Sequence, residues 1–383
     1  MKILHLMLAC FYIDNYSYQE NYLPKYHKKM GHEVEIIASL FSFDKNGNGM
    51  YLKKGDQYIN EDGIKVTRLD YANRPFARRF RYYVGLQKEI ERVQPELIFC
   101  HGVQFADIKI VRDYCRTHPN TKLYIDNHSD FSNSATNWVS QKILHEIIWK
   151  HYAQMINPYV KKFYGVLPAR VDFLVNEYKI PKNKVELLVM GADDESIDNA
   201  SSPKSIQELR EKYNIKSDDF LIMTGGKIDK WKTQTLLLIE AVKKLQNKKV
   251  KLIIFGSVTE ELQPKIQELV DGDKVKYIGW IQAKDSYKYF AAADLVVFPG
   301  RHSVFWEQVA AQGIPMIVKY WEGTTHIDMG GNVEFLKNDS VDEIKNTIEK
   351  VLEVDTYNNM KKVAVEKGRI NFAYSEIAKR SIN

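Results

Sequence analysis

The chain has 383 residues, of which 44% are hydrophobic and 27% charged, and its formal net charge is +6. A chain of this length is expected to form two domains of similar size, and the composition is that of a globular protein rather than a disordered one. The charge is too small to indicate a nucleic-acid-binding protein. Three cysteines without paired spacing, Cys10, Cys100 and Cys115, indicate a reducing compartment and no disulfide framework.

The N-terminal half alternates between predicted strands and helices. The first strand is expected at 3–9, an apolar run that ends without the small-residue cleavage site of a signal peptide. Further strands are expected at 32–38, 64–69, 96–100 and 123–126. Helices are expected at 21–30, through the basic segment to 93, and at 108–117. Because strands alternate with helices, the sequence predicts a parallel sheet that is covered on both faces.

The pattern restarts after a polar, turn-rich stretch at 196–206, which is expected to be a linker. Strands are expected at 220–224, 250–255, 275–278, 295–298 and 315–318. Helices are expected at 235–245, 262–269, 287–292, 344–352, 360–367 and 372–382. The predicted fold class is therefore α/β, with two Rossmann-like, doubly wound domains whose strand ends face an interdomain cleft.

A glycine-rich, basic loop, 225–233, follows the predicted strand at 220–224. Glycines such as Gly226 allow backbone to approach a ligand closely, and Lys227 and Lys232 can neutralise phosphate charge. The loop is therefore expected to bind phosphate, although a charged turn before a surface helix is the alternative. It lacks the spacing of a nucleoside-triphosphate loop, and no dinucleotide-binding glycine motif follows the first strand.

A second polar group, 298–315, follows the predicted strand at 295–298. Loop amides and a helix N-terminus suit an anion, and Arg301 adds positive charge. Ser303 is expected to support this site. Glu307 or Gln308 is expected to bond ribose hydroxyls, the alternative for Glu307 being a carboxylate on the helix surface. His302 is a candidate ligand contact, and the alternative is that it is a structural histidine whose hydrogen bonds are satisfied within the loop.

The segment that contains Arg74, Arg78, Arg79 and Arg81 is basic and rich in aromatic residues. Such a segment can lie on an anionic membrane surface, but a solvated helix face explains the charges equally well. No stretch approaches the roughly 20 apolar residues of a membrane span. The protein is therefore expected to be cytoplasmic, with peripheral contact at the inner face of the plasma membrane as an option.

The sequence gives no strong sign of a metal centre, and no metal is expected. Asp271 and Asp273 have metal-motif spacing but lie where a plain turn is expected, and Asp126 and Asp130 around His128 are weak signs. Four other histidines lie in apolar or helical surroundings and are expected to be structural: His5, His27, His145 and His151.

Several segments together resemble one family. They are the Gly31-His32-Glu33-Val34 strand start, the strand-end residues His101 and His128, Gly226-Lys227 with Lys232, and the segment from Pro299 to Pro315. They are similar to family 4 of the retaining glycosyltransferases, which have the GT-B architecture, and the resemblance covers nearly the whole chain. It implies an acceptor-side domain at 1–195, a nucleotide-sugar domain at 196–365 and a C-terminal helix, 366–383, that crosses back to the first domain.

The resemblance also implies a mechanism. A sugar leaves its nucleotide with retained anomeric configuration, Lys227 and Lys232 stabilise the charge on the diphosphate, and His128 contacts the donor sugar. No protein nucleophile and no cofactor are required. Aligned on Gly313-Ile314-Pro315, Gly300 and Gln308 occupy the positions of the family's two glutamates. Gln308 would then serve the ribose as an amide, and His302 is the candidate replacement for the missing sugar-side glutamate.

The expected function is therefore transfer from a nucleotide-sugar, with UDP favoured by family frequency, to a glycan or lipid-linked acceptor in surface polysaccharide synthesis. Nucleic acid is not expected as a partner. Two other functions compete with this prediction. One is a sugar-nucleotide epimerase of the same architecture, and the other is a non-catalytic, glycosyltransferase-like binding subunit.

Overall fold

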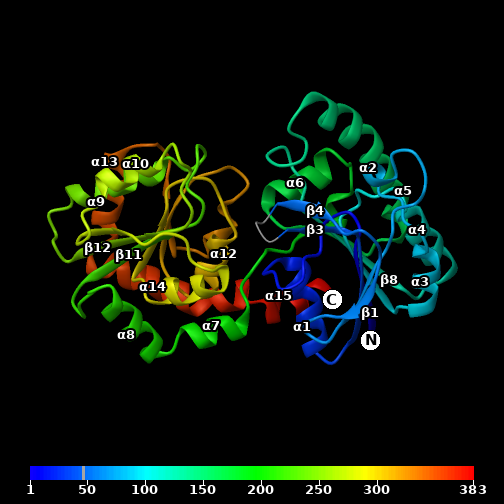
Figure 1. Cartoon of the computed structure of the whole chain (residues 1–383), viewed down its shortest axis with the longest axis horizontal. Coiled ribbons are helices and arrows are strands. Elements are labelled where there is room, and N and C mark those ends of the chain that lie inside the picture. The colour runs from blue at the N-terminus through cyan, green and yellow to red at the C-terminus, as the bar shows by residue number, and fades with distance from the viewer. Residues whose placement is uncertain (45–47) are drawn as a thin grey trace. The chain divides into compact units, whose positions relative to one another are not determined.

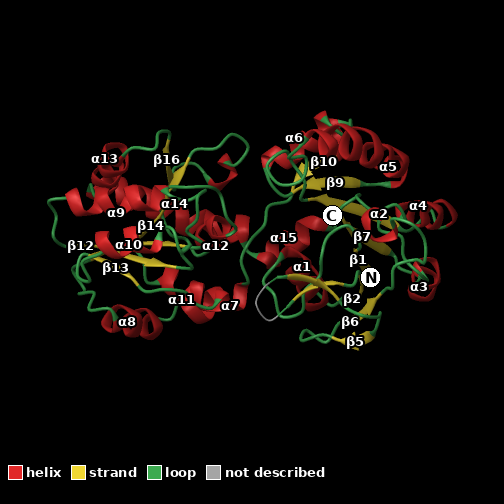
Figure 2. Ribbon diagram, turned by 45° about the horizontal axis from the view of Figure 1, so that its top comes forward, coloured by secondary structure: helices red, strands yellow, loops and turns green. Residues whose placement is uncertain are grey.

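The computed structural model describes residues 1–44 and 48–383. The chain divides into two compact units, Met1–Val189 together with Ile377–Asn383, and Met190–Glu376. Each unit is built on its own parallel sheet, with helices packed on both faces (Figures 1 and 2). The predicted α/β class, with two doubly wound parallel sheets, is confirmed.

The sheet of the first unit has the strand order β10-β9-β8-β7-β1-β2-β6-β5, and only β5 is antiparallel to its neighbour. Its central strand β1 is buried on both faces, which explains the continuous apolar run. The bounds are β1 (Lys2–Met7), β2 (Glu33–Ala38), β5 (Gln57–Ile59), β6 (Lys65–Arg68), β7 (Leu97–His101), β8 (Lys122–Asn127), β9 (Lys162–Gly165) and β10 (Val185–Leu187). A separate antiparallel pair is formed by β3 (Phe41–Phe43) and β4 (Gly49–Tyr51).

The helices of this unit connect successive strands. They are α1 (Gln19–Lys29), α2 (Ala77–Phe80), α3 (Leu86–Val93), α4 (Ile108–Thr117), the π-helix η1 (Ser140–Trp149), α5 (Lys150–Ile156), α6 (Pro168–Asn176) and the short 3-10 turns η2 (Asn157–Tyr159) and η3 (Lys182–Lys184). The last helix, α15 (Tyr374–Ser381), has its final turns in the first unit.

The sheet of the second unit has the order β13-β12-β11-β14-β15-β16 and is parallel throughout. The strand order therefore reverses between β11 and β14, the position where open α/β sheets bind ligands. The strands are β11 (Phe220–Gly225), β12 (Val250–Phe255), β13 (Val275–Tyr277), β14 (Leu295–Phe298), β15 (Met316–Lys319) and β16 (Val333–Leu336).

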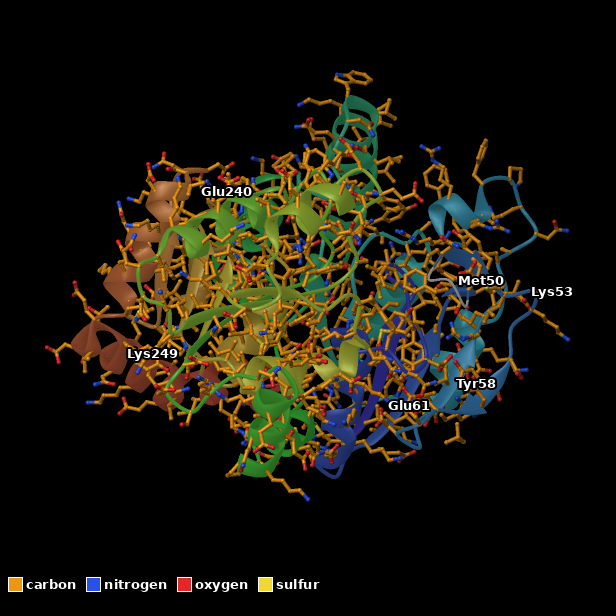
Figure 3. The ribbon with its side chains drawn as sticks, turned by 60° about the vertical axis from the view of Figure 1, so that its left-hand side comes forward. Met50, Lys53, Tyr58, Glu61, Glu240 and Lys249 are labelled. Carbon is orange, nitrogen blue, oxygen red and sulfur yellow. The ribbon has the colours of Figure 1, made fainter. Side chains whose placement is uncertain are left out.

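Helices cover both faces of this second sheet. They are α7 (Asp194–Ala200), α8 (Pro203–Lys212), α9 (Gln234–Lys244), α10 (Gln263–Leu269), α11 (Ser286–Ala291), α12 (Phe305–Ala311), α13 (Val341–Val351) and α14 (Val354–Phe372), with 3-10 turns η4 (Ala283–Asp285) and η5 (Thr325–Ile327). Charged side chains such as Lys53 and Lys249 lie on the surfaces of their units (Figure 3).

Two sequence predictions of local structure are wrong. Most of the stretch 196–206 lies in α7 and α8 rather than in a linker, because the turn-forming residues in and before it cap these helices. The side chains of Asp193 and Ser202 accept from backbone N–H groups at the starts of α7 and α8, and Pro203 occupies the first turn of α8. The basic segment is not one helix to 93, since left-handed residues at Phe76 and Arg81 confine α2 to one turn.

Among the described residues, no helix has both the length and the apolar character that crossing a membrane requires.

Candidate active site

The glycine-rich loop after β11 is shaped by close packing. Gly226 has φ +118°, a conformation that favours glycine, and a side chain on Gly256 would collide with the Gly226 carbonyl at 1.9 Å. A side chain on Gly225 would meet the Phe255 ring at 2.2 Å. The glycines therefore allow the ends of β11 and β12 to lie in direct backbone contact.

This loop lines a pocket at the point where the strand order reverses. Its walls come from the ends of β11 and β14, and they include Thr224, Lys227, Lys232, Gly300 and Arg301. Two stretches that the sequence placed in separate polar groups are thus brought together in one pocket of the second unit.

The two lysines of the loop differ in environment. Lys227 is exposed and its Nζ lies 4.0 Å from an Asp229 carboxylate oxygen. Lys232 is partly buried, and no carboxylate lies within ion-pairing distance of its Nζ in the described part of the chain. Burial lowers the pKa of Lys232, and the nearby charge of Asp229 opposes this effect only in part. Lys232 is therefore a desolvated cation in a pocket, which is the state that an anionic ligand stabilises.

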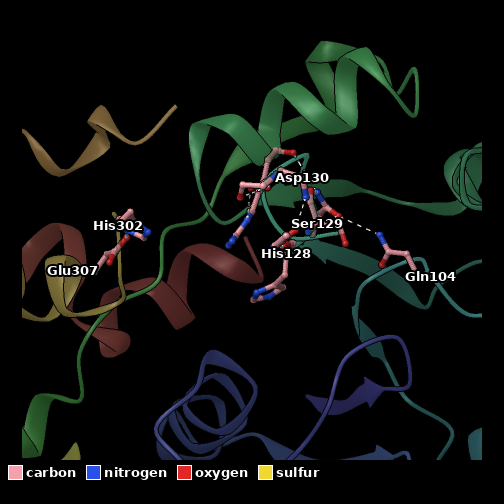
Figure 4. A network of polar contacts seen from close by, with 10 residues as sticks. Gln104, His128, Ser129, Asp130, His302 and Glu307 are labelled. Carbon is pink, nitrogen blue, oxygen red and sulfur yellow. Dashed lines mark hydrogen bonds and ion pairs between the residues drawn. The ribbon is translucent and has the colours of Figure 1, made fainter. Parts of the chain in front are cut away.

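The loop after β14 carries a buried carboxylate between two imidazoles. Glu307 on α12 is fully buried, and its Oε1 lies 2.9 Å from Nε2 of both His302 and His326 (His302 and Glu307, Figure 4). Burial alone would raise the pKa of Glu307, but His302 and His326 hold it well below its usual value. Glu307 therefore orients His302 rather than lying on the helix surface.

His326 has no counterpart in the sequence predictions. It stands in η5, 19 residues after Glu307, and it reaches the carboxylate only because the chain passes through β15 and returns. A single histidine in a Thr-Thr-His-Ile stretch gives no local signal.

The other predicted residues of this loop are placed as follows. The amide of Gln308 donates to Ser286 Oγ at 2.9 Å, so it faces α11. Ser303 Oγ is buried without a hydrogen-bond partner in the described residues. The Arg301 guanidinium lies over the Trp231 ring, 5.8 Å from its centroid.

In the first unit, His128 follows β8 in a loop that is held by side-chain hydrogen bonds and an ion pair (Figure 4). Asn133 Nδ2 donates to the His128 carbonyl at 2.7 Å, and Arg170 Nε lies 3.2 Å from Asp130 Oδ2. His128 Nε2 lies 3.3 Å from Asp126 Oδ2 and 3.9 Å from Glu20 Oε1. Burial opposes protonation of His128, but Asp126 and Glu20 raise its pKa. Glu20 was not predicted, since α1 brings it from far away in the sequence.

Among the residues that the structure describes, two sets of side chains have ligand atoms close enough to hold a metal ion. The atoms of Glu20, His101 and His128 lie within 4.8 Å of one another, and so do those of His302, Glu307 and His326. The distances between the nitrogen and oxygen atoms in each set are those of hydrogen bonds and ion pairs, so neither set is assigned as a metal centre. Asp271 accepts from the backbone of Asp273 and Val275, as in a plain turn.

Two doubly wound sheets, with a basic glycine-rich loop at the reversal point of the second, are the features of the GT-B class. Residues 205–369 match the family model described as Glycosyl transferases group 1. This match supports an enzyme of the glycosyltransferase class.

An uncharacterized glycosyltransferase of Methanocaldococcus jannaschii is 24% identical over 225 residues, which cover 54% of this chain and 55% of that protein. The chain therefore spans about half the length of this curated relative. A glycosyltransferase of Rickettsia africae has a similar structure, with a TM-score of 0.69 at 16% identity over 99% of this chain and 96% of that one. HepE of Anabaena, solved in complex with UDP-glucose, gives a TM-score of 0.63 at 16% identity, over 100% of this chain and 98% of HepE. These likenesses establish the GT-B fold.

Proposed function

We propose that the protein is a retaining glycosyltransferase of family 4, which transfers a sugar from a nucleotide-sugar to a glycan or lipid-linked acceptor in surface polysaccharide synthesis. The observation that carries the proposal is Lys232, a desolvated lysine without a carboxylate partner among the described residues, in a pocket at the reversal point of a parallel sheet. UDP is the favoured nucleotide of the donor, because HepE, which has the same fold, was solved with UDP-glucose.

Charge stabilisation accounts for the proposed reaction. When the sugar–phosphate bond breaks, negative charge develops on the diphosphate, and a cation that is already fixed and desolvated stabilises it without reorganisation. Lys232 is such a cation, and the exposed Lys227 adds a second charge at the same pocket. The unpartnered hydroxyl of Ser303 can donate to a phosphate oxygen, and Arg301 lines the pocket wall. Retention by front-face displacement needs no protein nucleophile, since the leaving phosphate takes the acceptor proton.

Sugar recognition is assigned to histidines. Glu307 accepts from Nε2–H of His302, which leaves Nδ1 of a neutral His302 as a hydrogen-bond acceptor. An acceptor nitrogen can bind a sugar hydroxyl, as the family's missing glutamate would. His128 is the proposed contact on the first unit, with its charge set by Asp126 and Glu20.

Nucleotide binding gives the first test. We expect UDP or UDP-sugars to raise the melting temperature of the pure protein, by about 3 °C or more at 100 times Kd. GDP, ADP and their sugar conjugates should have less effect. The effect should disappear in Lys232→Ala. If no nucleotide stabilises folded protein, the donor-site assignment is wrong and a non-catalytic binding subunit becomes the better description.

Peripheral membrane contact is a separate part of the proposal. Arg78 and Arg79 lie on α2, beside Phe76, whose side chain is 71% exposed. Arg74 stacks on Tyr82, with 3.9 Å between its Cζ and the ring centroid. Arg81 is turned inward and donates to the Gln104 carbonyl, so it is removed from the proposed surface.

Exposed apolar residues also lie on η1 and just before it, and the end of η1 packs against α2. Phe80 of α2 packs on Trp149 at the end of η1, with 6.3 Å between ring centroids. Along η1 and the residue pair before it, Trp138 and Ile147 are 67% and 63% exposed. Arginine charge beside exposed aromatic and aliphatic side chains is the chemistry that anionic lipid headgroups and acyl chains match.

Vesicle binding tests this contact. The protein should co-sediment with vesicles of phosphatidylglycerol and phosphatidylethanolamine, less so with pure phosphatidylcholine, and less at high salt. The pair Arg78→Gln and Arg79→Gln should weaken binding about tenfold or more, since each basic residue contributes about 1 kcal/mol. The pair Arg112→Gln and Arg116→Gln on α4 removes the same charge elsewhere and should change little. Equal binding to both vesicle types would refute the proposal.

A further inference from the structure

Four polar side chains that the proposed reaction does not use form a continuous buried chain that ends at Asp126 in the first unit, and they are Ser381, His27, His5 and His101. Nε2 of His27 lies 2.9 Å from Ser381 Oγ and 3.2 Å from the Ala378 carbonyl. His27 Nδ1 lies 3.0 Å from His5 Nε2, and His5 Nδ1 lies 3.0 Å from His101 Nε2. His101 Nδ1 lies 2.8 Å from Asp126 Oδ2. The chain thus runs from α15 through three stacked imidazoles to the carboxylate beside His128.

The fold fixes this chain on rigid elements. His5 and His101 stand on the adjacent parallel strands β1 and β7, where His5 is opposite Phe99, and His27 comes from α1. The ring centroids of successive histidines are 5.1 and 5.3 Å apart. All three imidazoles, Asp126 and Ser381 are fully buried. Water therefore cannot replace a missing partner in the chain, and every proton in it must be accounted for.

The α15 end sets the direction of the hydrogen bonds. The Ser381 hydroxyl donates to the Ala378 carbonyl at 2.8 Å, so its oxygen is left to accept from Nε2–H of His27. The opposite arrangement would place a bare nitrogen 3.2 Å from a carbonyl oxygen, lone pair against lone pair. Burial lowers the pKa of His27 to about 3 and that of His5 well below its usual value, so both rings are neutral and each carries one proton.

The direction of these hydrogen bonds determines how many protons the chain holds between His27 and Asp126. If His27 carries its proton on Nε2, its Nδ1 accepts from Nε2–H of His5, and His5 Nδ1 in turn accepts from Nε2–H of His101. A neutral His101 would face the Asp126 carboxylate with a bare Nδ1 at 2.8 Å, which is repulsive. The geometry is not that of a directed hydrogen bond, but a contact this short with a carboxylate requires a proton on His101 Nδ1. Four links need four protons, and three neutral rings supply three.

We propose that this histidine chain holds a fourth proton on the His101–Asp126 pair, and that His101 and Asp126 are thereby positioning residues that set the charge of His128. The pair carries no net charge, so His128 Nε2, 3.3 Å from Asp126 Oδ2, faces a compensated carboxylate. The charge of a proposed donor-sugar contact then depends on the C-terminal segment that supplies Ala378 and Ser381. The inference rests on the proposed function only for the role of His128 in transfer.

Other polar and titratable groups lie around the chain, including the buried Cys100 thiol near Asp126. Glu20 and Arg170 influence His128, Gln19 Nε2 donates to Asp126 Oδ2 at 3.2 Å, and the Cys10 thiol lies near Glu20 and Asp126. His32 lies beside His27, with 6.5 Å between ring centroids. None of these belongs to the chain, so replacing one chain member changes its proton count directly.

Two substitutions of His27 separate the proposal from a purely structural role. Glutamine can donate to Ser381 and accept from His5, so His27→Gln keeps the direction of the chain. Leucine can do neither, so His27→Leu lets His5 and His101 switch to their Nδ1–H tautomers, which satisfies Asp126 without the fourth proton. Asp126 then bears a full negative charge, and the titration midpoint of His128 should rise by about one unit or more.

The measurement is two-bond proton–nitrogen NMR on the full chain with 15N-labelled histidine. We expect Nε2–H tautomers for His5 and His27 in the wild type, an Nε2–H tautomer for His5 in His27→Gln, and an Nδ1–H tautomer for His5 in His27→Leu. The pH at which turnover falls to half should move with the titration midpoint of His128 in His27→Leu only.

An Nδ1–H tautomer of His5 or His27 in the wild type overturns the proposal, even if His27→Leu fails to fold. An unchanged titration midpoint of His128 in folded His27→Leu also overturns the proposal. So does the binding of one equivalent of zinc to the wild type, if His101→Gln abolishes that binding. Absence of turnover in the wild type would count against the proposed function alone, because the tautomers are read without activity.

Discussion

Lys232→Ala should lower kcat/KM for sugar transfer by about 10²- to 10³-fold, equivalent to roughly 3–4 kcal/mol of transition-state stabilisation. Lys232 is the partly buried cation of the pocket, and its Nζ would lie 3.4 Å from a side chain placed on Gly226. A phosphate oxygen bound against the Gly226 backbone would therefore be within reach of this ammonium group. The charge that develops on the leaving diphosphate increases the interaction in the transition state, so kcat should fall as well as affinity.

The loss should not come from unfolding. Burial lowers the pKa of Lys232, which means that the folded protein bears a desolvation cost at this position. Removing the ammonium group removes that cost, so the melting temperature without ligand should stay the same or rise. A large fall in melting temperature would indicate instead that Lys232 holds the loop together.

Lys230→Ala is the matched control. It removes the same charge from the same loop, but Lys230 is exposed and its Nζ lies over the Trp231 ring, 5.2 Å from the centroid. Its kcat/KM should stay within about threefold of wild type, as expected for an exposed charge. Equal losses in the two variants would show that the general positive potential of the loop matters, and not a specific contact from Lys232.

The regular part of the fold was predictable because its signal is local. Strands such as β1, β11 and β12 are buried on both faces and appear as continuous apolar runs. The strands β9 and β16 were missed, because four residues that include Lys162 or Glu334 give neither a run nor a clear alternation. Helix caps were misjudged for a related reason, since Asp and Ser favour turns and helix starts alike.

The candidate site was predictable only where it follows strand ends. Polar residues after β11 and β14 were identified from position alone, because parallel strands present their carboxyl ends at one edge. Partners from distant elements gave no signal, as with Glu20 beside His128 and His326 beside Glu307. His5 and His27 were expected to be structural because their neighbours are apolar, and a buried chain between them exists only in three dimensions.

Acid should destabilise the first unit well before its carboxyl groups titrate. His27 has an ordinary pKa of 6.5 when unfolded and a pKa of about 3 when folded, and burial also lowers the pKa of His5 and lowers that of His145 to about 4. Below pH 6.5 the unfolded chain therefore binds protons that the folded unit does not. The stability that these histidines contribute is present above pH 6.5 and is lost as pH falls toward the folded values.

The expected loss of unfolding free energy follows from the linkage between protonation and folding. Each imidazole that stays neutral in the folded unit contributes about 1.4 kcal/mol per pH unit below 6.5, so His5 and His27 together should lower the free energy of unfolding by about 4 kcal/mol at pH 5. The raised pKa of His128 has the opposite sign and offsets part of this loss. The lowered pKa values of Asp126 and Glu307 matter only at lower pH, because their stabilisation is lost below the ordinary range of carboxyl groups.

Hydrogen exchange at pH 7.5 and pH 5.0, corrected for the intrinsic rate, measures this loss for each unit separately. Amides of β1, β7 and α1 should lose more protection than those of β11 and β14. His27→Gln should reduce the pH dependence of the first unit by about one proton, because a neutral amide replaces an imidazole that resists protonation. His118→Gln, at the exposed end of α4, is the matched control and should leave the dependence unchanged. Equal protection of β1 at both pH values would mean that the buried imidazoles accept protons in the folded state, and the neutral hydrogen-bonded chain would then be wrong as well.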